Sequence, residues 1–280
     1  MDPMYTDFLP LPPSIQPTLI ERQPVARTPG LWAALGLLVL YFALQAGSGM
    51  LIALVMGLAT GFMHASQGAV QVGFQVRAML AQPDTQAVIV MLTLGMAAAV
   101  TLLLARRRWP GLWSLALPPG FGFTLPGRPL FFALAILVGL AAPLLGGLLT
   151  QVLSHGQRLG QDIQQLGSDT SPELRILLVL VVTALGPVVE ELLFRGVLLS
   201  ALLQRCRVGW AVGISSLLFA LVHLPGLHWQ WYALPDLALL ALALSWLRLR
   251  AGSIWPAVLA HGVNNLLAVA AWFVAVHLPS

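Results

Sequence analysis

The chain has 280 residues, of which 58% are hydrophobic and only 9% are charged. A soluble domain carries about 25% charged residues, so the composition excludes a soluble globular protein. The net charge of +4 arises from 14 basic residues, all of them arginines, which lie mostly in short loops beside apolar segments. Arginines placed in this way indicate membrane topology and do not favour a nucleic-acid partner.

Seven segments are apolar and of roughly the length needed to cross a bilayer as helices, which takes about 20 residues. The predicted fold class is therefore all-α: a polytopic membrane bundle of about seven transmembrane helices, or eight, that encloses a polar cavity and has the lipid bilayer as its partner. The predicted spans cover residues 31–60, 87–105, 129–153, 174–204, 208–224, 232–247 and 253–277.

The arginines also predict on which side of the membrane each loop lies. With the polar, proline-rich residues 1–30 in the cytoplasm, ten loop arginines lie inside and three lie outside, as the positive-inside rule requires. The first apolar run is far longer than the apolar part of a signal peptide, which has about 7–15 residues, so we expect it to remain as an anchor. A bacterial inner (plasma) membrane with a cytoplasmic N-terminus is the simplest location.

Ionisable groups divide the chain into two regions that follow the N-terminal tail, residues 1–30. The spans within residues 31–170 are nearly free of such groups and are interpreted as a scaffold, with outer loops at 61–86 and 154–173. Residues 171–280 carry the polar groups and are predicted to form the catalytic core. This core opens with a helix start, Ser171-Pro172-Glu173, in which a capping residue, a proline and an acid occupy the first turn.

Between Ile176 and Leu203, within the fourth predicted span, three residues are charged: Glu190, Glu191 and Arg195. Each charge costs about 2.5–3.5 kcal/mol at the centre of a membrane helix, so a function is the expected reason for its presence. Glu191 and Arg195 are four residues apart with the glutamate first, which favours an orienting ion pair on one helix face. Glu190 lies about 100° around the helix, and we expect its carboxylate to stay free to accept a proton.

Gly186-Pro187 precedes these glutamates by about one helical turn. Pro187 lacks the N–H that would bond to the Thr183 carbonyl, so this oxygen needs another partner. Broken membrane helices are tolerated where they line a water-filled cavity. The break can therefore serve either helix packing alone or the functional site.

Polar residues in two later spans recur at helical spacing. Phe219 and His223, and likewise His261 and Asn265, are four residues apart and so share a helix face. At a rise of about 1.5 Å per residue, Glu190, His223 and His261 lie roughly 16–24 Å from the nearest cytoplasmic arginine of their spans. We therefore expect them to meet in one pocket near the middle of the membrane. Carboxylates, imidazoles and an amide suit hydrolysis by activated water with stabilisation of the oxyanion.

These three motifs, taken together, resemble the signature of the CPBP family of intramembrane proteases. The family includes the type II CAAX prenyl proteases and bacteriocin-processing and immunity-associated membrane proteins. The likeness extends from residue 175 to residue 270, a third of the chain. The motifs that carry it read Glu190-Glu191-x-x-x-Arg195, Phe219-x-x-x-His223 and His261-x-x-x-Asn265.

The resemblance implies an intramembrane (metallo)endopeptidase. Glu190 with His223 would activate the water, His261 with Asn265 would stabilise the oxyanion, and the buried ion pair would hold the geometry. Glu190, His223 and His261 could equally bind one zinc ion, because two imidazoles and a carboxylate are usual ligands of catalytic zinc. We favour a metal-free reaction and keep zinc as the alternative.

A non-proteolytic membrane protein of the same fold is the competing hypothesis, either an immunity or scaffold protein or a proton-coupled transporter. Transporters usually repeat their polar groups in both halves, whereas this chain concentrates them in the second half. The expected substrate is a peptide or the terminus of a membrane protein. Asp236, in the sixth predicted span, lies outside the signature and either pairs with a cavity residue or lies at the outer interface.

Overall fold

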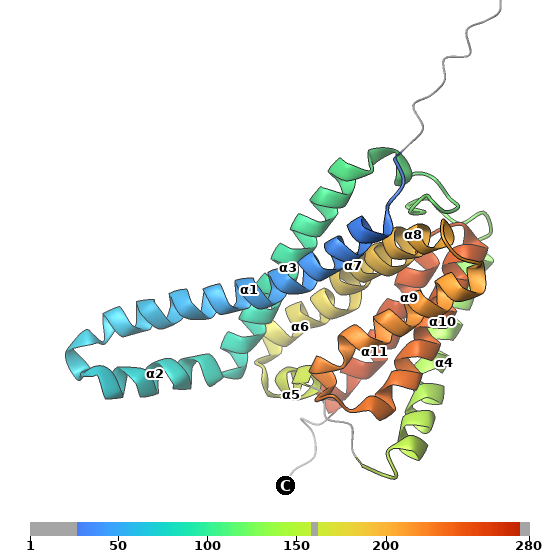
Figure 1. Ribbon diagram of the computed structural model, residues 1–280. Coiled ribbons are helices and arrows are strands. Elements are labelled where there is room, and N and C mark those ends of the chain that lie inside the picture. The colour runs from blue at the N-terminus through green and yellow to red at the C-terminus, as the bar shows by residue number, and fades with distance from the viewer. Residues whose placement is uncertain (1–26, 158–161, 275–280) are drawn as a thin grey trace, which may run out of the picture.

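The computed structural model describes residues 27–157 and 162–274, and every regular element in these ranges is a helix. Figure 1 shows a bundle from which a helical arm projects. The predicted all-α class is thus confirmed for the described part of the chain. The long helices are α1 (Leu31–Met63), α3 (Pro83–Arg108), α4 (Leu130–Leu153), α9 (Val208–His223), α10 (Leu234–Ala251) and α11 (Trp255–Val274).

One further long helix, which we call the central rod, consists of five consecutive segments. It begins where the sequence Ser171-Pro172-Glu173 predicts a helix start. The Ser171 side chain makes no cap; instead, the Ser171 backbone N–H donates to Asp84 Oδ1 at 2.7 Å. The segments are α6 (Pro172–Leu180), the π-helical η3 (Val181–Leu185), α7 (Gly186–Glu191), the π-helical η4 (Leu192–Leu198) and α8 (Leu199–Leu203).

Within the described ranges, five helices are long and apolar enough to cross a membrane, judged by length and composition. They are α1, α3, α4, the central rod, and Trp231–Ala251, which includes α10. α9 is apolar but has only 16 residues, about 24 Å of helix. α11 begins at Trp255, and the predicted end of its span at residue 277 lies outside the described residues. The predicted count of seven or eight spans is therefore not confirmed.

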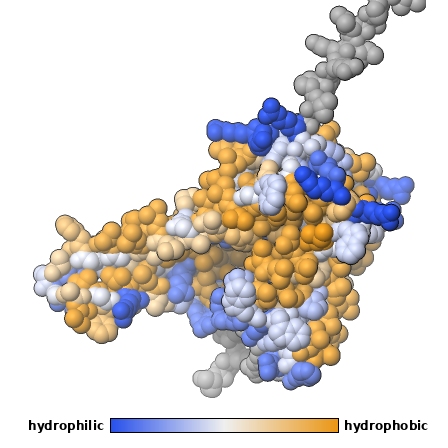
Figure 2. Space-filling view, viewed as in Figure 1, coloured by the Kyte–Doolittle hydropathy of each residue, from blue (hydrophilic) through white to orange (hydrophobic). Residues whose placement is uncertain are grey.

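Two short helices occupy stretches that the sequence predicts to be loops. α2 (Ala69–Ala81) runs back beside α1 and completes the projecting arm (Figure 1). α5 (Asp162–Asp169) packs against α3 and α11. The arm and the flank of the bundle carry a largely apolar surface (Figure 2). The remaining turns are η1 (Ala65–Gln67), η2 (Pro110–Leu112), η5 (Pro225–Leu227) and η6 (Trp231–Ala233).

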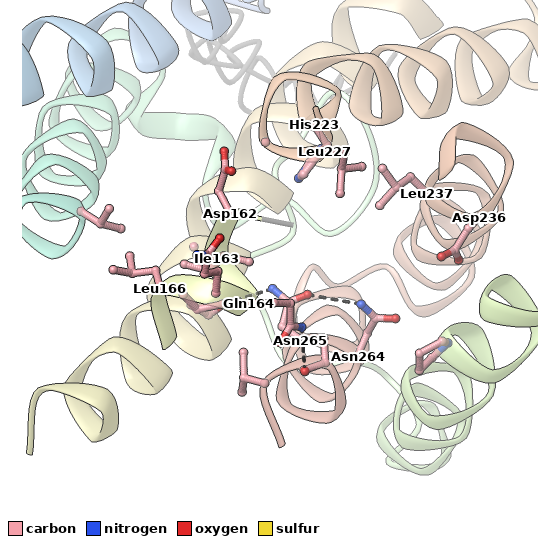
Figure 3. A pocket seen from close by; sticks show the side chains of 18 of the residues that line it. Asp162, Ile163, Gln164, Leu166, His223, Leu227, Asp236, Leu237, Asn264 and Asn265 are labelled. Atoms are coloured by element: carbon pink, nitrogen blue, oxygen red, sulfur yellow. Dashed lines mark hydrogen bonds between the residues drawn. The ribbon is translucent and has the colours of Figure 1, made fainter. Parts of the chain in front are cut away.

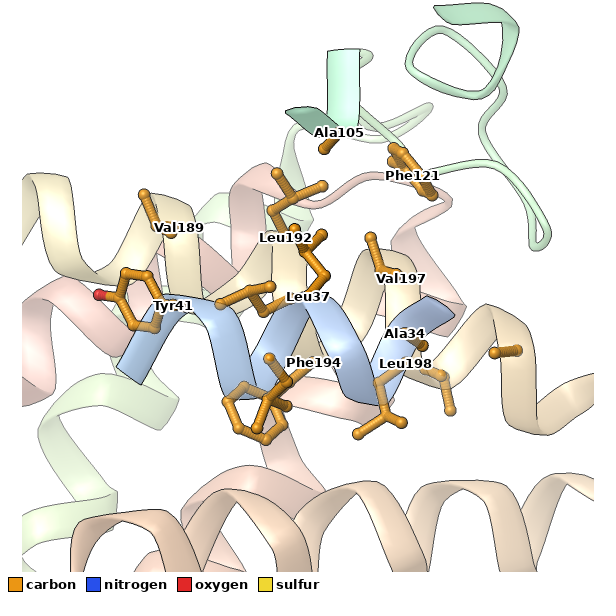
Figure 4. Packing of buried hydrophobic residues seen from close by; sticks show 14 of the residues in the cluster. Ala34, Leu37, Tyr41, Ala105, Phe121, Val189, Leu192, Phe194, Val197 and Leu198 are labelled. Atoms are coloured by element: carbon orange, nitrogen blue, oxygen red, sulfur yellow. The ribbon is translucent and has the colours of Figure 1, made fainter. Parts of the chain in front are cut away.

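The core of the bundle surrounds the central rod. Every residue from Leu192 to Leu202 is buried, which explains why this stretch is apolar on all faces apart from Arg195 and Ser200. Leu37 and Tyr41 of α1 belong to the same buried cluster as Val189 of the rod (Figure 4). Because protein interiors are close-packed, this contact fixes the rotation of the rod and with it the directions of the two glutamates.

Candidate active site

The central rod is opened by π-helical turns on both sides of the segment that carries the two glutamates. π-turns lengthen the helix repeat and occur often at functional sites. Pro187 follows the first π-turn, and α11 covers the carbonyls exposed there. The Asn265 Nδ2 donates to the Val182 carbonyl at 3.0 Å. The Thr183 oxygen lies against Gly262, where an added Cβ would come within 2.5 Å of it.

Glu191 and Arg195 form a buried ion pair. Arg195 Nη1 donates to Glu191 Oε1 at 2.8 Å, and the two side chains are 1% or less exposed. The second guanidinium nitrogen donates to the Ala241 carbonyl of α10 at 3.0 Å. The guanidinium also lies 4.5 Å from the centre of the Phe219 ring, a distance typical of a cation–π contact. These contacts join the central rod to α9 and α10.

His261 adds α11 to this group. Its Nδ1 lies 3.0 Å from Glu191 Oε1, and the residue is 3% exposed. A carboxylate paired with arginine can only accept, so Nδ1 carries the hydrogen of this bond. In the neutral ring the lone pair is then on Nε2. Glu191 therefore orients His261 as well as balancing Arg195.

His223 is oriented in the same way by its own helix. Its Nδ1 lies 2.7 Å from the Phe219 carbonyl, so Nδ1 donates and the neutral ring has its lone pair on Nε2. This Nε2 lies 3.6 Å from Glu190 Oε2, and His261 Nε2 lies 3.8 Å from the same oxygen. Glu190 Oε2 is buried and has no hydrogen-bond partner within the described residues. Three atoms with lone pairs thus face one another, an arrangement that attracts a proton donor such as water.

Glu190, His223 and His261 are also the residues that would bind zinc. Their donor types fit zinc, and both Nε2 atoms are free to bind a metal in the neutral rings. Among the described residues, however, no group of three or more histidine, cysteine, aspartate or glutamate side chains has the geometry of a metal site. The zinc alternative therefore has suitable ligands but no preformed site, and no step of the reaction proposed below depends on a metal.

A cavity of about 1320 Å³ contains this constellation. Its wall includes Glu190, His223, His261 and Asn265, together with residues of α3, α4, α5 and α10. Figure 3 shows Asn264 and Asn265 of α11 beside the side chains of α5, with Asp236 of α10 on the other side. Glu191 and Arg195 are not part of the wall and lie behind it.

Comparison with known protein families identifies the part of the chain that builds this site. Residues 172–267 match the family model of the Rce1-like type II CAAX prenyl endopeptidases. The resemblance to the CPBP family is thereby confirmed. The match covers about a third of the chain and spans the central rod, α9, α10 and most of α11. No match was found among the curated proteins or among the solved structures.

The match supports two coarse conclusions about the molecule. The matching family is one of proteases, so the match supports a peptidase function. Together with the five candidate spans, it also indicates an integral membrane protein. All six residues predicted from the CPBP motifs lie within the matched segment. The structure brings Arg195, His223 and His261 to the two glutamates, and Asn265 lines the same cavity but bonds to the Val182 carbonyl.

The structure adds cavity residues that the motifs do not contain. Asn264 lines the cavity, and its amide donates to Asn265 Oδ1 at 3.3 Å. It stands three residues after His261, a spacing that places the two on neighbouring helix positions and could have identified it. Thr150 and Asp162 come from the region interpreted as scaffold, and no local pattern marks them. Their place in the cavity depends on packing between helices distant in sequence.

Proposed function

We propose that this protein is an intramembrane endopeptidase that hydrolyses a peptide bond with water activated by Glu190 and His223. The observation that carries the proposal is the meeting of Glu190 Oε2 with the Nε2 atoms of His223 and His261 at 3.6 and 3.8 Å, inside a cavity of membrane helices. The match to a prenyl endopeptidase family supports the reaction class. The expected substrate is a peptide or the terminus of a membrane protein.

In the proposed reaction a water molecule donates one hydrogen bond to Glu190 Oε2 and one to His223 Nε2. Its oxygen forms a bond to the carbon of the peptide carbonyl while Glu190 takes its proton. The tetrahedral intermediate then collapses, the C–N bond breaks, and the proton passes from Glu190 to the leaving amine. The fixed tautomer of His223 makes its Nε2 an acceptor, so the attacking water is held in one orientation.

The oxyanion of the intermediate needs hydrogen-bond donors, which His261 and Asn265 supply in this proposal. Asn265 uses one amide hydrogen on the Val182 carbonyl and has a second one for the oxyanion. His261 donates through Nε2 only when its ring carries a second proton. Glu191, 3.0 Å from Nδ1, is the counter-ion that such a ring requires.

The test uses the full-length protein in liposomes with a peptide library. Glu190→Gln and His223→Ala should each lower the rate of cleavage by about 100-fold or more, because each removes a group that acts on the water. Glu173→Gln is the matched control, since Glu173 is exposed and lies outside the cavity wall. Full proteolysis by both site variants would refute the proposal.

Metal analysis of the same wild-type preparation separates the two versions of the mechanism. The metal-free version predicts that cleavage survives chelators and that zinc is present in less than stoichiometric amount. Stoichiometric zinc that disappears in His261→Ala would replace it with the zinc version, in which Glu190, His223 and His261 hold the metal.

A further inference from the structure

Asp236 is an acidic residue that the proposed chemistry does not use. It stands in the first turn of α10 and lines the cavity. Within the described part of the chain it has neither a hydrogen bond nor an ion pair. Its carboxylate fits against α4 at Gly146, where any side chain would collide with Asp236 Oδ1. An unpaired carboxylate that is partly buried is costly, so this fitted group indicates a ligand from outside the chain.

A second unpaired polar group lies close by along α4. Thr150 follows Gly146 by one helical turn and also lines the cavity. The residue is only 7% exposed, and its Oγ1 has no hydrogen-bond partner in the described residues. A buried hydroxyl without a partner is destabilising, so this site, too, is suited to a polar ligand group.

The charge of the cavity wall decides which kind of group that is. Although the chain has a net charge of +4, no arginine is among the described residues of the wall. A cavity with walls of one charge sign and low dielectric constant concentrates ligands of the opposite sign. The wall therefore favours a cation. Its acidic residues are Asp162, which pairs with His228 at 2.8 Å, Asp169, Glu190 and Asp236, and its titratable bases are His223 and His261.

Asp236 lies in the same cavity as the proposed catalytic residues, within reach of a peptide bound there. Asn264 stands three residues after His261, about 4.5 Å further along α11, and lines the cavity on the way to Asp236. Figure 3 shows Asp236 and Asn264 on facing helices of the same cavity. An extended peptide advances about 3.3 Å per residue, so a side chain a few residues from the scissile bond can reach this place.

We propose that Asp236 and Thr150 form a specificity subsite that binds a positively charged group of the peptide substrate. The group is an arginine or lysine side chain, or a free amino terminus, a few residues from the cleaved bond. Its N–H groups donate to the Asp236 carboxylate and to Thr150 Oγ1. The subsite rests on the endopeptidase function proposed above, and it names the substrate class of that site.

The first experiment measures selectivity in cleavage. Peptides that carry either arginine or its neutral isostere citrulline at each position are cleaved by the full-length protein in liposomes of zwitterionic lipid. If a side chain is the bound group, wild type should prefer the arginine peptide by about tenfold in kcat/KM, as expected for one charge-assisted hydrogen bond. Asp236→Asn and Asp236→Ser should bring the ratio close to one, and Glu173→Gln should leave it unchanged. An unchanged ratio in the Asp236 variants would overturn the subsite.

N-acetylation of the same peptides separates the two sources of positive charge. If acetylation lowers kcat/KM about tenfold for arginine and citrulline peptides alike, the free amino terminus is the bound group. If the preference survives acetylation, the bound group is the side chain. If acetylated citrulline peptides are cleaved as well as free arginine peptides, the cavity does not select for charge and the proposal is wrong.

A binding experiment keeps the subsite separate from catalysis. In a Glu190→Gln background, which removes the proposed base, arginine peptides should bind about tenfold more tightly than citrulline peptides. Adding Asp236→Asn should abolish that difference, and Thr150→Val should reduce it. Charge-selective binding that depends on Asp236, without cleavage by wild type, would retain the subsite and refute the protease. Equal binding of the arginine, citrulline and N-acetylated peptides would refute the subsite even if cleavage is observed.

Discussion

Two glutamates that are neighbours in sequence have opposite surroundings in the structure. The Glu191 side chain is fully buried and contacts Arg195 and His261 through its Oε1. Glu190 points about 100° away around the helix and presents Oε2 to the cavity without a hydrogen-bond partner in the described residues. Their different neighbours predict different effects of the same substitution on stability.

Glu191→Gln should destabilise the protein by about 3–5 kcal/mol, because it leaves the Arg195 guanidinium buried without its counter-ion. Glu190→Gln removes a carboxylate whose Oε2 has no hydrogen-bond donor among the described residues, so we expect it to leave the stability unchanged or to raise it. Thermal unfolding of both variants in detergent measures the difference. Equal losses of stability in the two variants would contradict this division of roles.

At the scale of secondary structure, α11 packs against the part of the central rod where the helical hydrogen bonds are interrupted. Asn265 bonds to the Val182 carbonyl, and Gly262 lets the Thr183 carbonyl approach its backbone. His261 stands on the same helix, immediately before Gly262. The packing of α11 against the carbonyls freed near Pro187 thereby also positions His261. The helix break therefore contributes both to packing and to the candidate site.

Gly262→Ala should separate α11 from the central rod, because the new Cβ would lie 2.5 Å from the Thr183 oxygen. We expect a loss of about 1–3 kcal/mol in stability. We also expect at least about a tenfold loss in cleavage, since His261 moves with the helix. Gly213→Ala in α9 is the control, as nothing lies within 4 Å of its added Cβ. Unchanged cleavage in Gly262→Ala would show that this close approach does not position the site.

At the scale of the whole molecule, the cavity belongs to both halves of the chain. Residues of α3, α4 and α5 line it together with the rod, α9, α10 and α11. The N-terminal helices are thus more than a support for the matched segment. Which ends of these helices face the cytoplasm remains a prediction from the distribution of arginines.

That topology predicts the accessibility of single cysteines. In a Cys206→Ser background, Ser66→Cys between α1 and α2 should react with a membrane-impermeant maleimide on intact cells. Arg107→Cys at the end of α3 should react only after permeabilisation. Both positions are exposed, so burial does not limit labelling. The opposite pattern would place the N-terminus outside.

The helices themselves were largely predictable from the sequence. The predicted spans at 129–153, 174–204 and 208–224 agree closely with α4, the central rod and α9. Long apolar runs mark such helices directly. α2 and α5 were missed, because a 13-residue and an 8-residue helix with several polar residues lack such a run. The number of membrane spans does not follow from the apolar runs alone, since α9 is apolar but shorter than a usual span.

The sequence alone determined the all-α class and the CPBP-type motifs. It also determined the pairing of Glu191 with Arg195, because residues four apart on a helix are neighbours in any tertiary structure. The tertiary structure decided what depends on contacts between distant helices. It places His261 on Glu191 and directs Asn265 to the Val182 carbonyl. It also leaves Asp236 and Thr150 in one cavity without a side-chain partner among the described residues. Local spacing carries no information about these contacts, since each is set by how close-packed helices fit together.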